Sequence, residues 1–362
     1  MHRVVRSFGP AVPGFIRGLR HPVRARQARI RQASRVSAAR RLVDALCGLE
    51  HDCLSAGAFR IEKHFMTAGD VLVTRIRSGE TGVVLKLATT DMAEQSFARH
   101  REAVTRIHAL PALADVKSLV PRVITWGRFE NCSYLMETAL GGEPVGRQVP
   151  AVVLQSLVRS AAGTLTKFQQ QTLQRRVIDE VLFENVAGRY VSQLRAFAGD
   201  SSQLHRRIDR TESELREVFM SLEMPLTWIH GDYWPGNLLY RRTGGARISG
   251  IVDWDRASQA ELPLHDLLHL MVYSRKLRQS GSLGHFVANR ILPRVFENGE
   301  WELLEQAGSQ LGLPLTADVL RAMTLAYWAR FVSEHLSRYP EFMGNRRWFD
   351  ENVAGVLSAI AP

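Results

Sequence analysis

Hydrophobic and polar residues follow two different periods along the chain, and these divide it into a β-rich section and a longer helical one. Between Val36 and Leu49, hydrophobic residues recur at three- and four-residue steps, the spacing of an amphipathic helix that docks on a folded body. Residues 70–78 and 81–88 instead form short strand patterns that flank the turn-like segment SGETG. This arrangement predicts two strands joined in a β-hairpin.

A second set of elements completes the β-rich section. Residues 92–110 carry a helical pattern that Pro111 ends, and residues 121–129 and 133–140 then predict two further strands. The order strand–strand–helix–strand–strand predicts a small mixed lobe that ends near residue 140.

Helical patterns dominate after Gly146, with one interruption. The segment WIHGDYWPGNLLY, residues 228–240, breaks the helical run and leads into a second predicted hairpin around the turn TGG. Helical patterns then resume to the end of the sequence. We therefore expect an α+β fold of two lobes: a small mixed β-sheet lobe with one helix, and a larger helical lobe that contains a β-hairpin.

The charge distribution adds a third part to this organisation. Eleven arginines against Asp44 and Glu50 give residues 1–50 a net charge of +9, so the other 312 residues carry only +2 of the total +11. We expect residues 1–35 to be a basic flexible arm, residues 36–140 the N-terminal lobe and residues 141–362 the C-terminal lobe. A nucleic-acid partner is not expected, because the body of the protein is nearly neutral.

The arm itself leaves alternatives open. Its apolar core FGPAVPGFI is shorter than a secretory signal needs, and its lack of acids resembles an organelle transit peptide. We rank that interpretation below an arm that makes weak contact with an anionic surface or stays solvated.

Cysteine usage and hydropathy indicate the compartment. Cys47, Cys53 and Cys132 form neither an even disulfide set nor a metal-binding CxxC pair, so free thiols in a reducing compartment are expected. No uncharged apolar run reaches the roughly 18 residues of a membrane-spanning helix. The predicted location is the cytoplasm.

Three polar residues around the second hairpin carry the candidate chemistry. Asn237 lies just before its first strand and Asp253 at the end of its second, so antiparallel pairing makes them neighbours. Amide and carboxylate oxygens, completed by nucleotide phosphates, suit Mg²⁺. Asp232, five residues before Asn237, is placed to reach an acceptor hydroxyl next to a metal-bound phosphate. Phosphoryl transfer needs this division between a base and metal ligands.

The spacing of His230, Asp232 and Asn237 is that of the kinase catalytic loop H-R-D-x-x-x-x-N. Here the chain resembles the aminoglycoside phosphotransferase and choline kinase superfamily, which shares the protein-kinase-like fold. The resemblance covers about residues 60–335 and includes HGDYWPGN, IVDWD, LPLHDLLHL with Asp266, VVLKLA, HREA and YLMETALGGEPV. It implies an enzyme that transfers the γ-phosphate of ATP to a hydroxyl of a small molecule, with Mg²⁺.

The same resemblance implies a nucleotide site. Lys86 in VVLKLA would hold phosphates, and Glu102 of HREA, rather than Glu94, would be its partner. The carbonyl of Glu137 and the amide of Ala139 would face the purine. No G-x-G-x-x-G motif precedes Lys86, and the turn around Gly69 is the expected phosphate-binding segment.

The acceptor and two supporting roles are less defined. A sugar, an amino alcohol, a cell-envelope precursor and an antibiotic all remain candidate acceptors. A core stripe is preferred over a sugar platform for Tyr327, Trp328 and Phe331. His230 and Asp255 are expected to be supporting residues. The alternative function is a catalytically silent nucleotide-binding scaffold, with association to a membrane surface left open, although a scaffold does not need the complete Lys/Asp/Asn/Asp set.

Overall fold

The structure of the protein is a computed structural model that describes residues 35–45, 59–67, 71–78, 81–88, 90–242, 246–297, 299–339, 342 and 344–360. Most of the predicted basic arm, Cys47, Cys53 and Gly69 lie outside the described residues, and the predictions about them stay predictions. The chain forms two compact units, one of Met1–Gly146 with Gly236–Arg256 and one of Arg147–Pro235 with Ala257–Pro362. Each unit is described by itself.

The first unit is built on a five-stranded antiparallel sheet in the order β1-β2-β3-β5-β4. The predicted hairpin is confirmed, because β2 and β3 pair from Leu72↔Leu87 to Ser78↔Thr81. Strands β3 and β5 pair antiparallel with Lys86 opposite Leu135 and Val84 opposite Glu137. The strands are β1 (Phe59–Met66), β2 (Leu72–Ser78), β3 (Thr81–Ala88), β4 (Val123–Phe129) and β5 (Cys132–Thr138).

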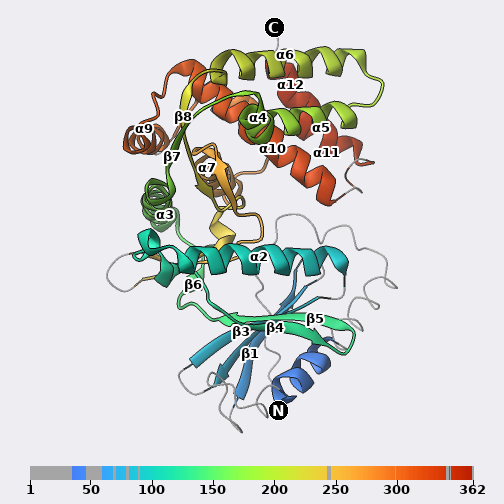
Figure 1. Cartoon of the computed structure of the whole chain (residues 1–362), viewed down its shortest axis with the longest axis vertical. Coiled ribbons are helices and arrows are strands. Elements are labelled where there is room, and N and C mark those ends of the chain that lie inside the picture. The colour runs from blue at the N-terminus through green and yellow to red at the C-terminus, as the bar shows by residue number, and fades with distance from the viewer. Residues whose placement is uncertain are drawn as a thin grey trace. The chain divides into compact units, whose positions relative to one another are not determined.

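Helices cover the two faces of this sheet. The helix over residues 35–45 buries Ala38, Ala39, Leu42 and Val43 in one core with Leu85 and Met136, as the helical spacing predicts. Helix α2 (Asp91–Ala109) runs along the other face of the sheet (Figure 1). It contributes Ala93 and Phe97 to a separate core with Ala88 and Leu135. Because neighbouring strand residues point to opposite faces, Lys86 lies on the α2 side of the sheet.

Strand β1 was not predicted from the sequence. It is an edge strand with exposed Arg60, Lys63 and His64, and its register shifts between Ile61 and Lys63. Charged residues and bulges are common on edge strands, where they discourage pairing with other chains, and they obscure the alternating pattern.

The second hairpin is also confirmed, but its contacts place it with the first unit rather than with the helical one. Strand β9 (Leu238–Arg241) pairs with β10 (Arg247–Ile251) on one side and with β6 (Glu143–Pro144) on the other. The hydrogen bonds to β6 explain this assignment. Short 3-10 helices complete the unit: η2 (Pro111–Leu113), η3 (Lys117–Leu119) and, at its junction with the second unit, η5 (Pro235–Asn237).

The second unit is mainly helical, so the predicted α+β fold is confirmed. Its one small sheet has the order β11-β8-β7, with β7 (Gln174–Val177), β8 (Glu223–Ile229) and β11 (Ser258–Glu261). The helices are α3 (Ala151–Thr172), α4 (Glu180–Phe183), η4 (Glu184–Gly188), α5 (Arg189–Phe197), α6 (Ser202–Phe219), α7 (His265–Lys276), α8 (Leu283–Phe286), η6 (Val287–Ile291), α9 (Glu300–Leu311), α10 (Ala317–Arg338), α11 (Arg346–Phe349), η8 (Asp350–Ala354) and α12 (Gly355–Ile360).

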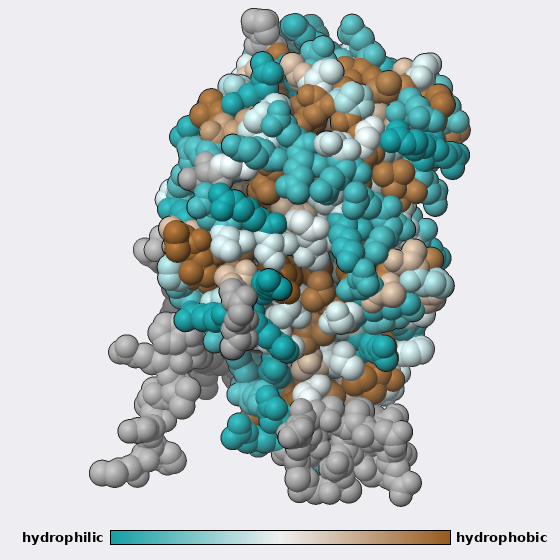
Figure 2. Space-filling view, turned by 90° about the vertical axis from the view of Figure 1, so that its left-hand side faces the viewer, coloured by the Kyte–Doolittle hydropathy of each residue, from teal (hydrophilic) through white to brown (hydrophobic). Residues whose placement is uncertain are grey.

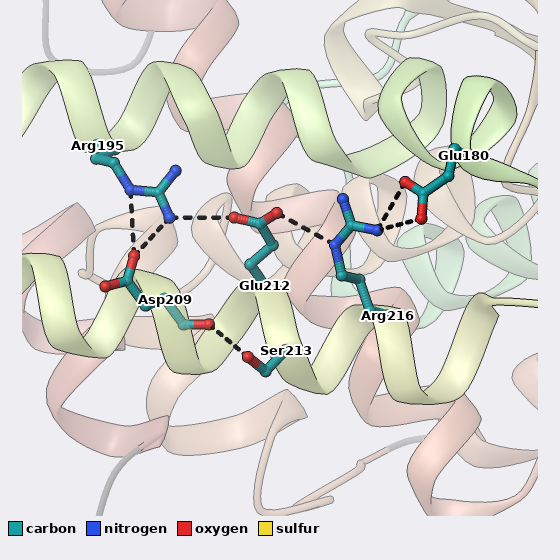
Figure 3. Close-up of polar contacts among 6 residues, drawn as sticks. All are labelled: Glu180, Arg195, Asp209, Glu212, Ser213 and Arg216. Carbon is teal, nitrogen blue, oxygen red and sulfur yellow. Dashed lines mark hydrogen bonds and ion pairs between the residues drawn. The ribbon is translucent and has the colours of Figure 1, made fainter.

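A row of ion pairs links three of these helices at the surface of the second unit (Figure 3). Arg216 of α6 pairs with Glu180 of α4 at 2.8 Å and with Glu212 at 3.2 Å. Arg195 of α5 also contacts Glu212, at 3.1 Å, and it pairs with Asp209. The network joins α4 and α5 to α6 through exposed side chains, which usually contribute little stability individually.

Hydrophobic residues are dispersed on the face shown in Figure 2, where hydrophilic residues separate the hydrophobic patches. The cores take up most large apolar side chains, and the exposed ones include Trp126, Val152 and Val181. Among the described helices, none combines the length and the apolar character needed to cross a membrane.

Candidate active site

A buried ion pair defines the part of the site that lies in the first unit. The Nζ of Lys86 lies 2.9 Å from Oε1 of Glu137, and the Glu137 side chain is only 2% exposed. Burial lowers the pKa of Lys86, but the carboxylates of Glu137, Asp253 and Asp255 outweigh it and raise that pKa above its ordinary value. Burial likewise raises the pKa of Glu137, yet Lys86 and His100 lower it to about 2. Both groups are therefore charged at neutral pH.

The prediction that Glu102 pairs with Lys86 is wrong. The Glu102 side chain is 60% exposed and pairs with Arg106 at 2.7 Å, one turn along α2. Glu94, the competing residue, pairs with Arg128 at 3.2 Å. The reason is helical phase, because residues three and four positions after Glu102 are the polar Thr105 and Arg106.

His100 occupies the position on α2 that faces the ion pair. It is followed at helical spacing by buried Ala103, Val104 and Ile107, and its own side chain is 2% exposed. Its Nε2 lies 2.7 Å from Oε2 of Glu137, and its Nδ1 accepts a hydrogen bond from the backbone N–H of Trp254 at 3.2 Å. Since Nδ1 accepts, Nε2 carries the proton and faces Oε2 of Glu137. His100 thus connects the ion pair to the residue after Asp253.

Asn237 and Asp253 lie at the same end of the hairpin, as the sequence predicted. Ile251 pairs with Leu238, and beyond this pair the N–H of Val252 donates to the carbonyl of Asn237 at 2.9 Å. Asp253 follows directly and has a left-handed φ of 70°, which a non-glycine residue rarely adopts and aspartate tolerates better than most. One amide and one carboxylate at this point form a hard-oxygen donor set that fits Mg²⁺.

Asp255 is anchored to α2. Its Oδ2 accepts a hydrogen bond from the hydroxyl of Ser96 at 2.6 Å, and its carbonyl accepts one from Nε of Arg99 at 3.2 Å. These bonds support the predicted supporting role, because they fix the segment that carries Asp253.

The predicted purine contact at Ala139 does not agree with the structure. The amide of Ala139 donates to the carbonyl of Gly82 at 2.9 Å, so it continues the β3–β5 ladder. The Glu137 side chain points to the Lys86 face of the sheet, since Glu137 pairs with Val84 and Lys86 with Leu135. Strand β5 (Cys132–Thr138) ends two residues before the predicted strand, and the Ala139 amide still bonds to β3.

Asp232, the predicted base, lies in a loop of the second unit that the buried Asp266 holds. The carboxylate of Asp266 accepts the backbone N–H of His230 at 2.6 Å and that of Gly231 at 2.9 Å. Burial raises the pKa of Asp266, although these N–H donors and nearby histidines oppose the increase. Within the loop, Nδ1 of His230 accepts the N–H of Asp232 at 3.2 Å, which agrees with a structural His230.

The sequence analysis missed the residue that contacts the Asp232 carboxylate. Nε2 of His269 lies 3.2 Å from Oδ1 of Asp232, and its Nδ1 lies 3.0 Å from the hydroxyl of Tyr327. The His269 side chain is 4% exposed, whereas that of Asp232 is 24% exposed. His269 follows Asp266 by three residues on α7, so the two side chains lie on one helix face. That spacing was the available signal.

Comparisons with known proteins identify the family and the fold. Residues 70–295, more than half of the chain, match the model of the APH family, described as the phosphotransferase enzyme family. No curated protein matches the sequence.

Solved structures of low sequence identity share the fold. A thermostable variant of aminoglycoside phosphotransferase APH(4)-Ia, in complex with ADP and hygromycin B, has a TM-score of 0.54 at 13% identity, with 88% of this chain and 99% of that chain covered. The structure of APH(4)-Ia itself has a TM-score of 0.54 at 14% identity, with 90% and 100% covered. The expected kinase-like fold is thus confirmed, and by the match to the family model the chain belongs to the phosphotransferase enzyme family.

Proposed function

We propose that the protein is an ATP- and Mg²⁺-dependent kinase that phosphorylates a hydroxyl of a small molecule. The observation that carries this proposal is the buried Lys86. The negative charges of Glu137 and Asp253 raise its pKa and so keep it protonated. Burying a cation costs folding free energy, which pairing only offsets. A buried lysine with such partners therefore suggests a function, and in kinases that function is phosphate binding.

In this proposal the residues of the first unit bind the nucleotide. Lys86 contacts the phosphates, while Glu137 and His100 hold it in position. Asn237 and Asp253 hold magnesium, which when bound neutralises charge on the transferred phosphoryl group. Since the Ala139 amide is engaged by Gly82, we assign the purine contacts to the carbonyl of Thr138 and the amide of Leu140. The role of Gly69 stays a prediction.

Asp232 of the second unit accepts the proton of the acceptor hydroxyl. His269 donates from Nε2 to Oδ1 of Asp232 and so fixes the orientation of the carboxylate. The hydroxyl of Tyr327 then donates to Nδ1 of His269, which keeps the proton of the ring on Nε2. This assignment makes His269 a positioning residue and Asp232 the catalytic one.

Replacing Asp232 tests the proposal. Asp232→Asn keeps the size of the side chain but cannot accept the proton, so transfer should fall by about 10²- to 10⁴-fold. Nucleotide affinity should stay within about threefold, because Asp232 is not assigned to the nucleotide. Asp209→Asn, an exposed change on α6, is the control and should leave both values unchanged.

The measurement is ADP release with ATP, Mg²⁺ and a panel of sugars, amino alcohols and aminoglycosides, including the hygromycin B bound by APH(4)-Ia. Turnover by Asp232→Asn equal to that of the original protein would exclude Asp232 as the base. Nucleotide binding without turnover of any acceptor would favour the scaffold.

A further inference from the structure

Two helix faces of the second unit extend outward from Asp232. On α7 the residues His269, Tyr273 and Lys276 follow at steps of four and three, so they share one face. On α10 the residues Tyr327 and Phe331 are four apart and also share a face. The rings of His269 and Tyr327 lie 5.9 Å apart, and those of Tyr273 and Phe331 lie 6.3 Å apart, so the two faces meet.

These faces become more exposed with distance from the base. His269 and Tyr327, which form the hydrogen-bonded end, are buried. Tyr273, Phe331 and Lys276 are half-buried. Trp234, two residues after Asp232 and also half-buried, places its ring 5.6 Å from that of Tyr273. We call Trp234, Tyr273 and Phe331 the aromatic wall. The wall begins beside the catalytic loop, and its three residues are each half-buried.

Lys276 adds a positive charge to the aromatic wall. Its Nζ lies 4.5 Å from the centre of the Tyr273 ring, and no carboxylate of the described residues pairs with it. Burial lowers the pKa of this ammonium to about 8. The contrast with Lys86 is informative, because Lys86, which is also desolvated, has Glu137 as its counter-ion. A partly desolvated ammonium without an acid is suited to an anionic ligand.

The acids near the aromatic wall are already engaged. On α7 and α10, Asp266 accepts two backbone N–H groups of the catalytic loop, and Glu334 pairs with Arg330 at 3.0 Å. Glu261 pairs with Arg330 at 2.8 Å, and Glu300 accepts a hydrogen bond from Arg275, also at 2.8 Å. Since these carboxylates neutralise arginines or hold backbone, they are poor partners for the ammonium groups of a polycationic substrate.

We propose that the aromatic wall and Lys276 bind the acceptor, and that the acceptor is a hydroxyl compound with a planar unsaturated group and an anionic oxygen group. Stacking on half-exposed rings favours a planar group. The ammonium of Lys276 binds a carboxylate or phosphate, while Asp232 receives the proton of the hydroxyl. This inference rests on the proposed function, because it specifies the substrate class of the same site.

Four acceptor classes test this inference. The probes are 3-hydroxybenzoate (planar and anionic), 3-hydroxybenzamide (planar and neutral), glycerate (anionic and not planar) and kanamycin (polycationic). ADP release with ATP and Mg²⁺ gives kcat/KM for each. Lys276→Met removes the charge, Lys276→Arg keeps it, and Lys63→Met is the matched control, because Lys63 also lies over a ring, 6.0 Å from Phe65. Thermal unfolding confirms that each variant is folded.

We expect 3-hydroxybenzoate to have the highest kcat/KM. Lys276→Met should reduce that value by at least about tenfold, the effect of one charge-assisted hydrogen bond, while Lys276→Arg retains most of it. Lys63→Met should leave it unchanged. A preference for kanamycin or glycerate would overturn the inference. A change in the KM for ATP instead of the acceptor would also overturn it, since Lys276 would then serve the nucleotide.

Binding without turnover separates this inference from the proposed function. In Asp232→Asn, titration of each probe against tryptophan fluorescence reports binding alone. Binding of 3-hydroxybenzoate that depends on Lys276, without phosphoryl transfer by the original protein, would support the inference and contradict the proposed function. Phosphoryl transfer to kanamycin would support the proposed function and contradict the inference. If no probe binds and none is phosphorylated, the inference is wrong.

Discussion

Each unit contains a buried histidine that contacts one acidic side chain, and the surroundings of the two acids differ. In the first unit His100 contacts Glu137, which also pairs with Lys86 and is 2% exposed. In the second unit His269 contacts Asp232, which is 24% exposed. The first acid holds a cation, whereas the second is partly exposed, as the base of the proposed function needs to be. In that proposal the neighbours of each acid, rather than its histidine, set its role.

The largest expected effect comes from removing the charge of Glu137. Glu137→Gln leaves the Lys86 ammonium buried without a counter-ion, which typically costs about 3–5 kcal/mol of unfolding free energy. Urea denaturation followed by circular dichroism measures this change. The double variant Lys86→Met/Glu137→Gln should recover part of the loss, because no unpaired charge remains. A loss below about 1 kcal/mol in Glu137→Gln would show that the pair is not buried as described.

The stability of the protein at acid pH gives a second test of the Glu137–Lys86 ion pair. The pKa of Glu137 is lowered from 4.5 to about 2, so its ion pair stabilises the folded state above about pH 4.5 and this contribution is lost as the pH falls toward 2. Between pH 5 and pH 2 the original protein should therefore lose about 3 kcal/mol more than Glu137→Gln. Parallel pH dependence of the two proteins in urea denaturation would contradict the assignment.

Replacing His269 tests the other side of the comparison. His269→Asn cannot contact Asp232 and Tyr327 together, and a misplaced base typically costs about 10- to 100-fold in kcat. The KM for ATP and the thermal midpoint should change little, which distinguishes positioning from general destabilisation. Tyr327→Phe removes only the hydroxyl and should have a smaller effect on kcat. An equal loss of kcat and nucleotide affinity would argue against the positioning role.

The smallest effect is expected at the surface network of Figure 3, far from either histidine along the chain. Arg216→Ala removes ion pairs with Glu180 and Glu212, whose side chains are 70% and 23% exposed. Exposed pairs contribute about 0–1 kcal/mol each, so the unfolding free energy should fall by about 1 kcal/mol and kcat should not change. A larger loss would mean that packing of Arg216 over Phe183 matters more than its charge.

Sequence reasoning identified the parts of the site that depend on chain spacing. Strand pairing brings Asn237 next to the segment of Asp253. The hairpin is a local feature that the sequence pattern of two apolar segments around TGG predicts. The spacing of Asp232 and Asn237 along the chain is likewise read directly from the sequence. These features needed no knowledge of tertiary structure.

The wrong and missed site residues are those whose contacts depend on tertiary packing. The REA motif led to the prediction that Glu102 is the partner of Lys86. The buried Ala103, Val104 and Ile107 instead define the core-facing side of α2, on which His100 lies. The acid that pairs with Lys86 comes from β5, and the register between β3 and β5 is a long-range property that neither strand specifies alone. His269 was missed because its partner, Asp232, is 37 residues away along the chain.

The order in which the chain is synthesised gives the β6–β9 pairing a further consequence. Strand β6 ends at Pro144, but its partner β9 begins at Leu238, after α3, α5, α6 and β8 of the second unit have been made. The first unit therefore cannot complete its hydrogen bonding as an early, independent folding step. During synthesis, residues 147–235 of the second unit are made before β9 can pair with β6, so the first unit completes its hydrogen bonding only after that segment has been added.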